Sequence, residues 1–321
     1  MPPEILAGTM PETLATMPAA PRSRLSASKF RRWTEREDVF SWLMIGPPML
    51  FLILLVGYPF LYGIWLSLQD RPVARAGTFV GLANFIADAR DPVFWQVTVN
   101  TFVYTIVATL LKMVGGLGLA LVMNQNFRFK NTIRALMLLP FIVPTVLSTI
   151  AWQWILDPAF APVNWFLRYF DLANPGPSWL GNSYLAMMSL IIVNVWRGLP
   201  FYGITLLAGL QTISPELYEA ATIDGASTWD RFIYVTLPLL KPVIFIVTMF
   251  SIIFTFADFQ LVYVLTHGGP ANATHLFATY AFDIAMGGGQ LGMGASIALA
   301  MLPPLTLIIV AMSIYMKPNK S

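Results

Sequence analysis

Long apolar stretches with almost no charged side chains constrain the fold of this chain more than any other feature. Six stretches are long enough to cross a membrane, because a membrane-crossing helix needs about 20 mostly apolar residues. They cover residues 42–66, 101–123, 135–156, 184–207, 242–264 and 294–316. Only 11% of all residues are charged, against about 25% in an ordinary soluble domain. The chain is therefore predicted to be an all-α membrane protein with six transmembrane helices.

Lysine and arginine are unevenly distributed between the segments that connect these stretches. If the N-terminus is cytoplasmic, 13 of the 19 Lys and Arg residues lie on the cytoplasmic side, which is the side that carries the excess in membrane proteins. Both termini are therefore predicted to be cytoplasmic. Residues 1–38 lack the compact apolar core of a cleavable signal, so we expect a flexible cytoplasmic tail there and a transmembrane domain at 39–321. Because the basic residues form no single face, nucleic acid is not an expected partner.

Several kinds of chemistry lack the residues that they need. The chain has no cysteine and two histidines, which leaves little for metal or nucleophilic sites. A phosphate-binding loop of the form G-x-x-x-x-G-K-[ST] is absent from the sequence. We therefore expect no catalytic site, no metal site and no cofactor bound by this chain.

The predicted cytoplasmic loop 208–241 differs from the other loops because it contains signals for two short helices. Ser214 is a good N-cap for the first helix, and Gly225 is placed to end it. The segment Ser227–Asp230 fits a capping box that opens the second helix, and Leu237–Pro238 is expected to close it. On these signals alone, the loop is either an ordered docking element or a plain helical connection.

The same loop resembles the EAA loop of ABC importer permeases, in their carbohydrate branch. The family pattern of EAA, three residues, Gly, nine residues, Ile, one residue and Leu-Pro is matched except at Val235, where the family has Ile. The resemblance covers roughly Tyr58 to the C-terminus and implies that the loop docks on a cytoplasmic ATPase. It assigns this coupling role to Glu219, Ala220, Ala221, Asp224, Gly225, Leu237 and Pro238.

This resemblance also implies a fold, a location and a set of partners. The fold is that of a type I ABC importer permease in the bacterial cytoplasmic membrane, in contact with membrane lipid. The implied partners are a second, related permease in a heterodimer, two ATPase subunits that hold ATP and Mg²⁺, and an extracytoplasmic sugar-binding protein. Transport is expected to proceed by alternating access, driven by binding energies that differ between the inward and outward states.

Polar and charged residues inside the predicted spans are candidates for a substrate site, because such residues are rare in lipid. Lys112, Arg197 and Asp258 are the charged ones. On a helix, residues at i, i+3, i+4 and i+7 share a face, so two spans are expected to present facing polar and aromatic stripes. The stripes are Asn194, Gly198 and Phe201 on the fourth span, and Ser251, Phe254, Thr255 and Asp258 on the fifth; Arg197 is a further candidate substrate-binding residue on the fourth span.

Hydroxyls, amides and aromatic rings are suited to a neutral sugar, although small polar residues also hold membrane helices together. The two stripes resemble the maltose-type larger permease branch, which has a polar residue other than Thr at position 255 and an apolar one at position 197. Gly198 and Pro200 are expected to bend the fourth helix and bring its backbone near a ligand. In the third span, Pro140 and Pro144 predict kinks. An ion-coupled secondary transporter acting alone, with Asp258, Arg197 and Lys112 as relay groups, is the alternative.

Overall fold

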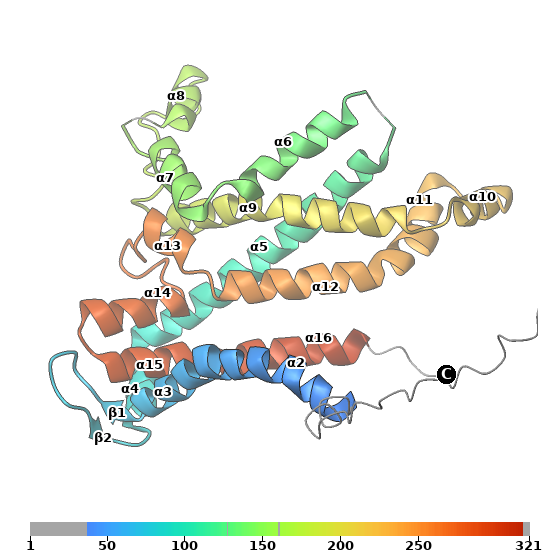
Figure 1. Cartoon of the computed structure of the whole chain (residues 1–321). Helices are drawn as coiled ribbons and strands as arrows, with labels where there is room; N and C mark the ends of the chain where they lie inside the picture. Colours follow the sequence, from blue (N-terminus) through green and yellow to red (C-terminus); the bar gives the residue numbers. More distant parts are fainter. Residues whose placement is uncertain (1–36, 127, 160, 317–321) are drawn as a thin grey trace, which may run out of the picture. The chain divides into compact units, whose positions relative to one another are not determined.

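The computed structural model describes residues 37–126, 128–159 and 161–316, which fold almost entirely into helices (Figure 1). Two compact units are distinguished, one ending at Pro59 and one beginning at Phe60. The elements are α2 (Glu37–Leu52), η1 (Ile53–Gly57), α3 (Tyr58–Ser67), β1 (Gln69–Asp70), β2 (Thr78–Phe79), α4 (Ala83–Arg90), α5 (Pro92–Asn124), α6 (Lys130–Ile142), α7 (Thr145–Ile155), α8 (Pro162–Tyr169), α9 (Ser183–Gln211), α10 (Pro215–Ile223), α11 (Thr228–Arg231), η2 (Phe232–Thr236), α12 (Leu237–Phe256), α13 (Gln260–Leu265), α14 (Phe277–Phe282), η3 (Asp283–Gly287), α15 (Leu291–Ala300) and α16 (Leu302–Met316). The two short strands pair antiparallel, with Gln69 opposite Phe79. Of the predicted tail 1–38, residues 1–36 lie outside the described residues.

Helices long and apolar enough to cross a membrane overlap the predicted spans. In the described part of the chain there are five of them, and the bent pair α6 and α7 brings the number to six if it forms one span. The predicted third span at 135–156 is divided between α6 and α7, which meet at an angle of 94°. The break contains Val143, which is extended, and Pro144, where the sequence predicts a kink. A residue before proline is pushed out of the helical region, so the helix is interrupted at this point, whereas Pro140 lies inside α6.

Two predicted helix ends are wrong, the end of the second loop helix and the end of the fifth span. Leu237–Pro238 does not close the second loop helix, because α11 continues through the π-helical turn η2 into α12. The π-helical turn η2 lies just before Pro238. Proline has no N–H to donate to the α-helical hydrogen bond at this position, and the wider turn of η2 accommodates it. The predicted fifth span 242–264 ends early, because α12 stops at Phe256. Asp258 therefore lies beyond the helix that was expected to carry it.

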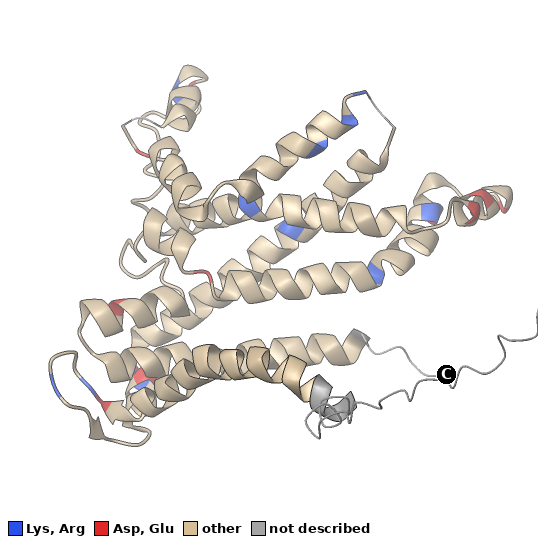
Figure 2. Ribbon diagram, viewed as in Figure 1, with Lys and Arg blue, Asp and Glu red and all other residues tan. Residues whose placement is uncertain are grey.

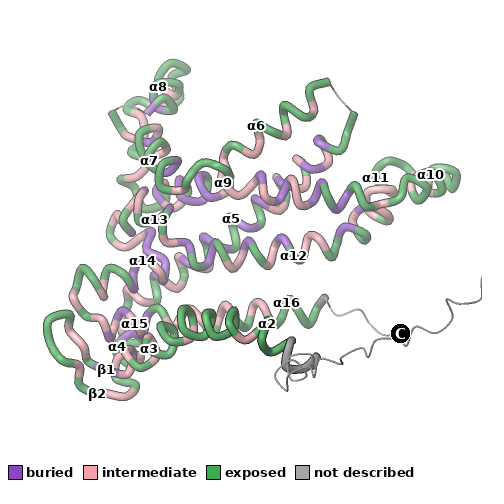
Figure 3. Tube along the Cα trace, viewed as in Figure 1, coloured by how far each residue is buried: buried purple, intermediate pink, exposed green. Residues whose placement is uncertain are grey.

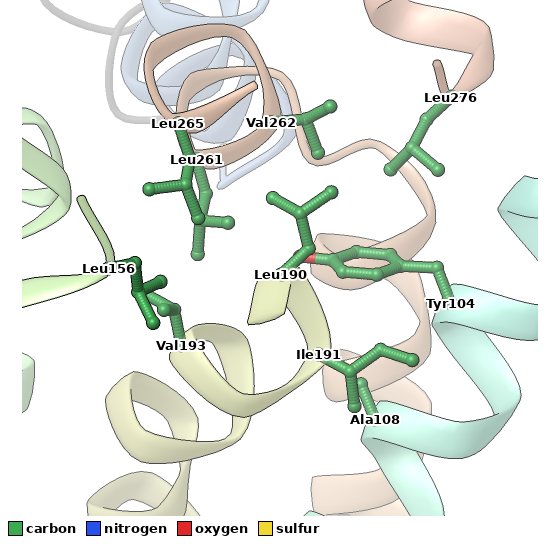
Figure 4. Packing of buried hydrophobic residues seen from close by; sticks show 10 residues of the cluster. All are labelled: Tyr104, Ala108, Leu156, Leu190, Ile191, Val193, Leu261, Val262, Leu265 and Leu276. Atoms are coloured by element: carbon green, nitrogen blue, oxygen red, sulfur yellow. The ribbon is translucent and has the colours of Figure 1, made fainter. Parts of the chain in front are cut away.

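The longest helices, α5 and α9, pack against each other and form the centre of the second unit. Buried positions recur along α9, whereas α10 and α11 are largely exposed (Figure 3). The two helices approach closely at Gly116, where an added Cβ would collide with the Cβ of Tyr202. Small residues allow membrane helices to pack this closely. Figure 4 shows the neighbouring cluster, in which Tyr104 and Ala108 of α5 lie beside Leu190 and Ile191 of α9.

Side-chain caps set the starts of these two helices. Asp91 accepts a hydrogen bond from Val93 N at 2.9 Å and is followed by Pro92 at the first position of α5. Asn182 accepts from Tyr184 N and Leu185 N at 3.0 and 3.2 Å at the start of α9. Each cap satisfies backbone N–H groups that have no partner within the helix.

A buried carboxyl group holds α4 against α15. Ser296 Oγ on α15 donates a hydrogen bond of 2.6 Å to Asp88 Oδ2 on α4. Burial is the main cause that raises the pKa of Asp88 from 3.8 to about 6; the hydrogen bond from Ser296 opposes the rise, and the charge of Asp91 adds to it. The folded protein therefore holds a proton on Asp88 at pH values at which the unfolded chain has already released it.

We expect the stability of the native protein to fall as the pH rises from about 4 to about 6, relative to that of the Asp88→Asn variant. In this window the native state binds one more proton than the unfolded state, so raising the pH favours unfolding. Midpoints of thermal unfolding at pH 4, 5, 6 and 7 measure the difference between the two proteins. Asp70→Asn, at an exposed acid of β1, is the matched control. A difference between native protein and Asp88→Asn that stays constant over this range would contradict the assignment.

Candidate functional site

A cavity of about 320 Å³ lies in the second unit, between the middle of α9 and the C-terminal end of α12. All eight residues predicted to bind substrate line it, namely Asn194, Arg197, Gly198, Phe201, Ser251, Phe254, Thr255 and Asp258. Lys112 of α5 and Phe141 of α6 also line the cavity. The two predicted stripes therefore face one cavity, which is where the helical spacing places them.

Asp258 is the centre of a hydrogen-bonded network at one end of the cavity. Its Oδ2 accepts from Tyr104 OH at 2.8 Å and from Asn194 Nδ2 at 3.1 Å. Its Oδ1 accepts from Leu261 N at 3.4 Å, at the start of α13. The prediction that Asp258 continues the stripe of α12 is corrected here: the carboxylate ties the chain after α12 to α5 and α9. Buried polar groups are expected to be paired in this way.

Lys112 has a partner that the sequence did not reveal. Its Nζ donates a hydrogen bond of 2.8 Å to Thr255 Oγ1, and the residue is buried. The lysine side chain crosses α9 at Gly198, where an added Cβ would lie 2.5 Å from Lys112 Cδ. Gly198 therefore makes room for the lysine. α9 runs as one helix from Ser183 to Gln211, so the chain is not interrupted at Gly198 and Pro200, and a bend at these two residues stays a prediction.

The remaining wall offers aromatic faces and free polar atoms. Phe141 and Phe201 stack with ring centroids 6.1 Å apart. Phe254 of α12 is an exposed side chain that also lines the cavity. Two buried atoms of cavity residues, Asn194 Oδ1 and Ser251 Oγ, have no hydrogen-bond partner within the described chain. Phe141 was missed in the sequence because it lies on α6, whose sharp turn into α7 brings it to the cavity from outside the two stripes.

The residues predicted to couple to an ATPase lie on α10, on the turn after it and at the start of α12. Ser214 caps α10, and Gly225 follows its end with a φ of +84°. The N–H groups of Gly225 and Ala226 bond back to Thr222 O and Ala221 O at 3.1 and 2.9 Å, a Schellman motif that favours glycine. These features and the Ser227–Asp230 capping box are confirmed.

Exposed side chains on this part of the chain include acids and apolar groups. Glu219, Ala220, Asp224, Gly225 and Pro238 are exposed, and acidic residues gather on α10 (Figure 2). Ile223 is 86% exposed and Trp229 is 68% exposed. Sequence reasoning did not single out these two, although a large apolar residue in a polar connecting loop is a usable signal for a contact surface.

Comparison with known proteins places the chain in a family. Residues 112–317 match the family described as binding-protein-dependent transport system inner membrane component. The chain belongs to this family. The trehalose/maltose transport system permease protein of Thermococcus litoralis is 35% identical over 265 residues, which are 82% of this chain and 89% of that protein. The sulfoquinovosyl glycerol transport system permease protein of Agrobacterium fabrum is 31% identical over 291 residues, 89% of this chain and 94% of that protein.

The fold of this permease is shared with a solved transporter. A chain of a bacterial ABC transporter involved in the import of the acidic polysaccharide alginate superposes with a TM-score of 0.75 at 20% identity. The superposition covers 90% of the permease and 100% of that chain. The predicted resemblance to ABC importer permeases is therefore confirmed, and the permease is a helical, multi-pass membrane protein.

Proposed function

We propose that the permease carries a carbohydrate across the bacterial cytoplasmic membrane as one subunit of an ATP-driven, binding-protein-dependent importer. The observation that carries this proposal is the cavity, where aromatic rings stand beside free polar atoms. Sugar hydroxyls need hydrogen-bond partners, and the C–H faces of a sugar ring pack on aromatic planes. Asn194 Oδ1 and Ser251 Oγ can serve the hydroxyls, and Phe201 and Phe254 can serve the ring. The names of the relatives, which include trehalose, maltose and sulfoquinovosyl glycerol permeases, support a carbohydrate.

The proposed importer requires partners on both sides of the membrane. A second permease would complete the translocation path, an extracytoplasmic sugar-binding protein would deliver the substrate, and two ATPase subunits would supply energy. In this arrangement both termini and α10 are cytoplasmic. Glu219, Ala220, Ala221, Asp224 and Gly225 would contact the ATPase, with Leu237 and Pro238 at the junction with α12. The exposed Ile223 and Trp229 supply the apolar area that such a contact needs.

We expect Ser251→Ala and Asn194→Ala each to lower sugar uptake roughly threefold to tenfold, because each removes about one hydrogen bond to the substrate. Uptake of labelled sugar is measured in proteoliposomes that contain the complete importer and ATP. Ser313→Ala is the matched control, because this exposed hydroxyl donates a hydrogen bond of 2.8 Å to Ile309 O of its own helix and does not line the cavity. Uptake that remains unchanged in both cavity variants, with normal assembly, would assign these residues to helix packing.

A further inference from the structure

Arg197 brings a guanidinium to the cavity. The residue is half-buried on α9, and its charge interacts with that of Asp258, but no direct hydrogen bond or ion pair joins the guanidinium to another described residue. A guanidinium offers five N–H donors in a planar fork that fits the oxygens of a carboxylate or phosphate. Phe141, Phe201 and Phe254 line the same cavity and give it apolar surface. Such surroundings strengthen an interaction with an opposite charge and make a group without a partner costly.

The other two charged residues of the cavity are already engaged. Asp258 is the only acid among the lining residues of the described cavity, and it is 7% exposed. Its two oxygens accept from Tyr104, Asn194 and Leu261. Lys112 is 4% exposed and donates to Thr255. A molecule in the cavity therefore meets the positive charge of Arg197, while both carboxylate oxygens of Asp258 already accept hydrogen bonds from the protein.

We propose that the cavity takes a carbohydrate with an acidic group, such as a carboxylate or a sulfonate, and that Arg197 binds this group. The inference rests on the proposed function, since it specifies which class of carbohydrate the same cavity accepts. Lys112 adds a second positive charge to the cavity wall, so among the described lining residues two cations outnumber the one anion. The sugar ring packs against Phe201 and Phe254, and Arg197 holds the acidic oxygens by two parallel hydrogen bonds.

Methyl glycosides that differ at one carbon test the proposal. Methyl β-glucoside is neutral, methyl β-glucuronide carries a carboxylate, and methyl sulfoquinovoside carries a sulfonate. Each is titrated against the purified complete transporter in detergent, without its binding protein, whose own specificity then makes no contribution. Saturation-transfer NMR reports the binding. The variants are Arg197→Gln, Arg197→Lys and the control Arg168→Gln, at an exposed arginine of α8.

We expect at least one acidic glycoside to bind about tenfold or more tightly than the glucoside, as charge-assisted hydrogen bonds allow. Arg197→Gln should abolish this preference, Arg197→Lys should keep part of it, and Arg168→Gln should leave it intact. The acidic glycoside that binds more tightly shows whether the cavity prefers a carboxylate or a sulfonate, and either preference supports the proposal. Equal binding of neutral and acidic glycosides to the native transporter would overturn it, as would an equal loss for both kinds in Arg197→Gln. Binding of no glycoside at all would overturn the carbohydrate function as well.

Discussion

The Asp258→Ala variant is expected to unfold at a markedly lower temperature than the native protein and to lose most of its transport. Alanine leaves the buried donors of Tyr104, Asn194 and Leu261 without an acceptor, at about 1–3 kcal/mol for each donor. The loss also frees the segment after α12 from α5 and α9. Thermal unfolding of the assembled transporter and uptake of labelled sugar measure the two effects.

Asp258→Asn is the matched variant, because its amide keeps one acceptor oxygen for the Tyr104 hydroxyl. We expect it to fall between the native protein and Asp258→Ala in both measurements. If Asp258→Ala unfolds at the native temperature, the three donors have found other partners, and the network does not hold this end of the cavity together.

Reversing the charge of Glu219 is expected to lower uptake roughly tenfold or more, while the amount of protein in the membrane stays the same. The proposed ATPase surface meets this exposed carboxylate on α10, and like charges opposed across an interface cost several kcal/mol. Sugar-stimulated ATP hydrolysis by the complete importer, compared between Glu219→Lys and the native protein, reports the coupling directly.

Glu216→Lys is the control for this prediction, since Glu216 lies in the first turn of the same helix and carries the same charge. It tests whether any basic residue on α10 is harmful. Normal coupling in Glu219→Lys, or equal losses in both variants, would contradict the assignment of Glu219 to the contact.

Local patterns in the sequence predicted those parts of the fold and site that depend on neighbours along the chain. The Ser214 cap, the left-handed Gly225 and the Ser227–Asp230 capping box each involve only a few adjacent residues. The stripe of Asn194, Gly198 and Phe201 follows the period of a helix that forms without interruption. Such features can be read from spacing because backbone geometry alone determines them.

Several of the errors concern features set by contacts between distant segments. The end of α12 at Phe256 carries no proline or glycine signal, and Asp258 is placed by donors from α5, α9 and α13. The role of Gly198 depends on Lys112, which is 86 positions earlier in the chain. Pro238 is a usual signal for the end of a helix, yet the helix continues past it through the preceding π-helical turn η2. The placement of Asp258 and the role of Gly198 do not follow from spacing within one segment.

The source of energy for transport tests the central claim most directly. Proteoliposomes are prepared with the permease alone and with its partner permease, ATPase subunits and binding protein, and each is given labelled sugar with either ATP or an ion gradient. The account predicts uptake only when the partners and ATP are all present. Uptake by the permease alone, driven by an ion gradient, would contradict it and would make Asp258, Arg197 and Lys112 the relay groups of a secondary transporter.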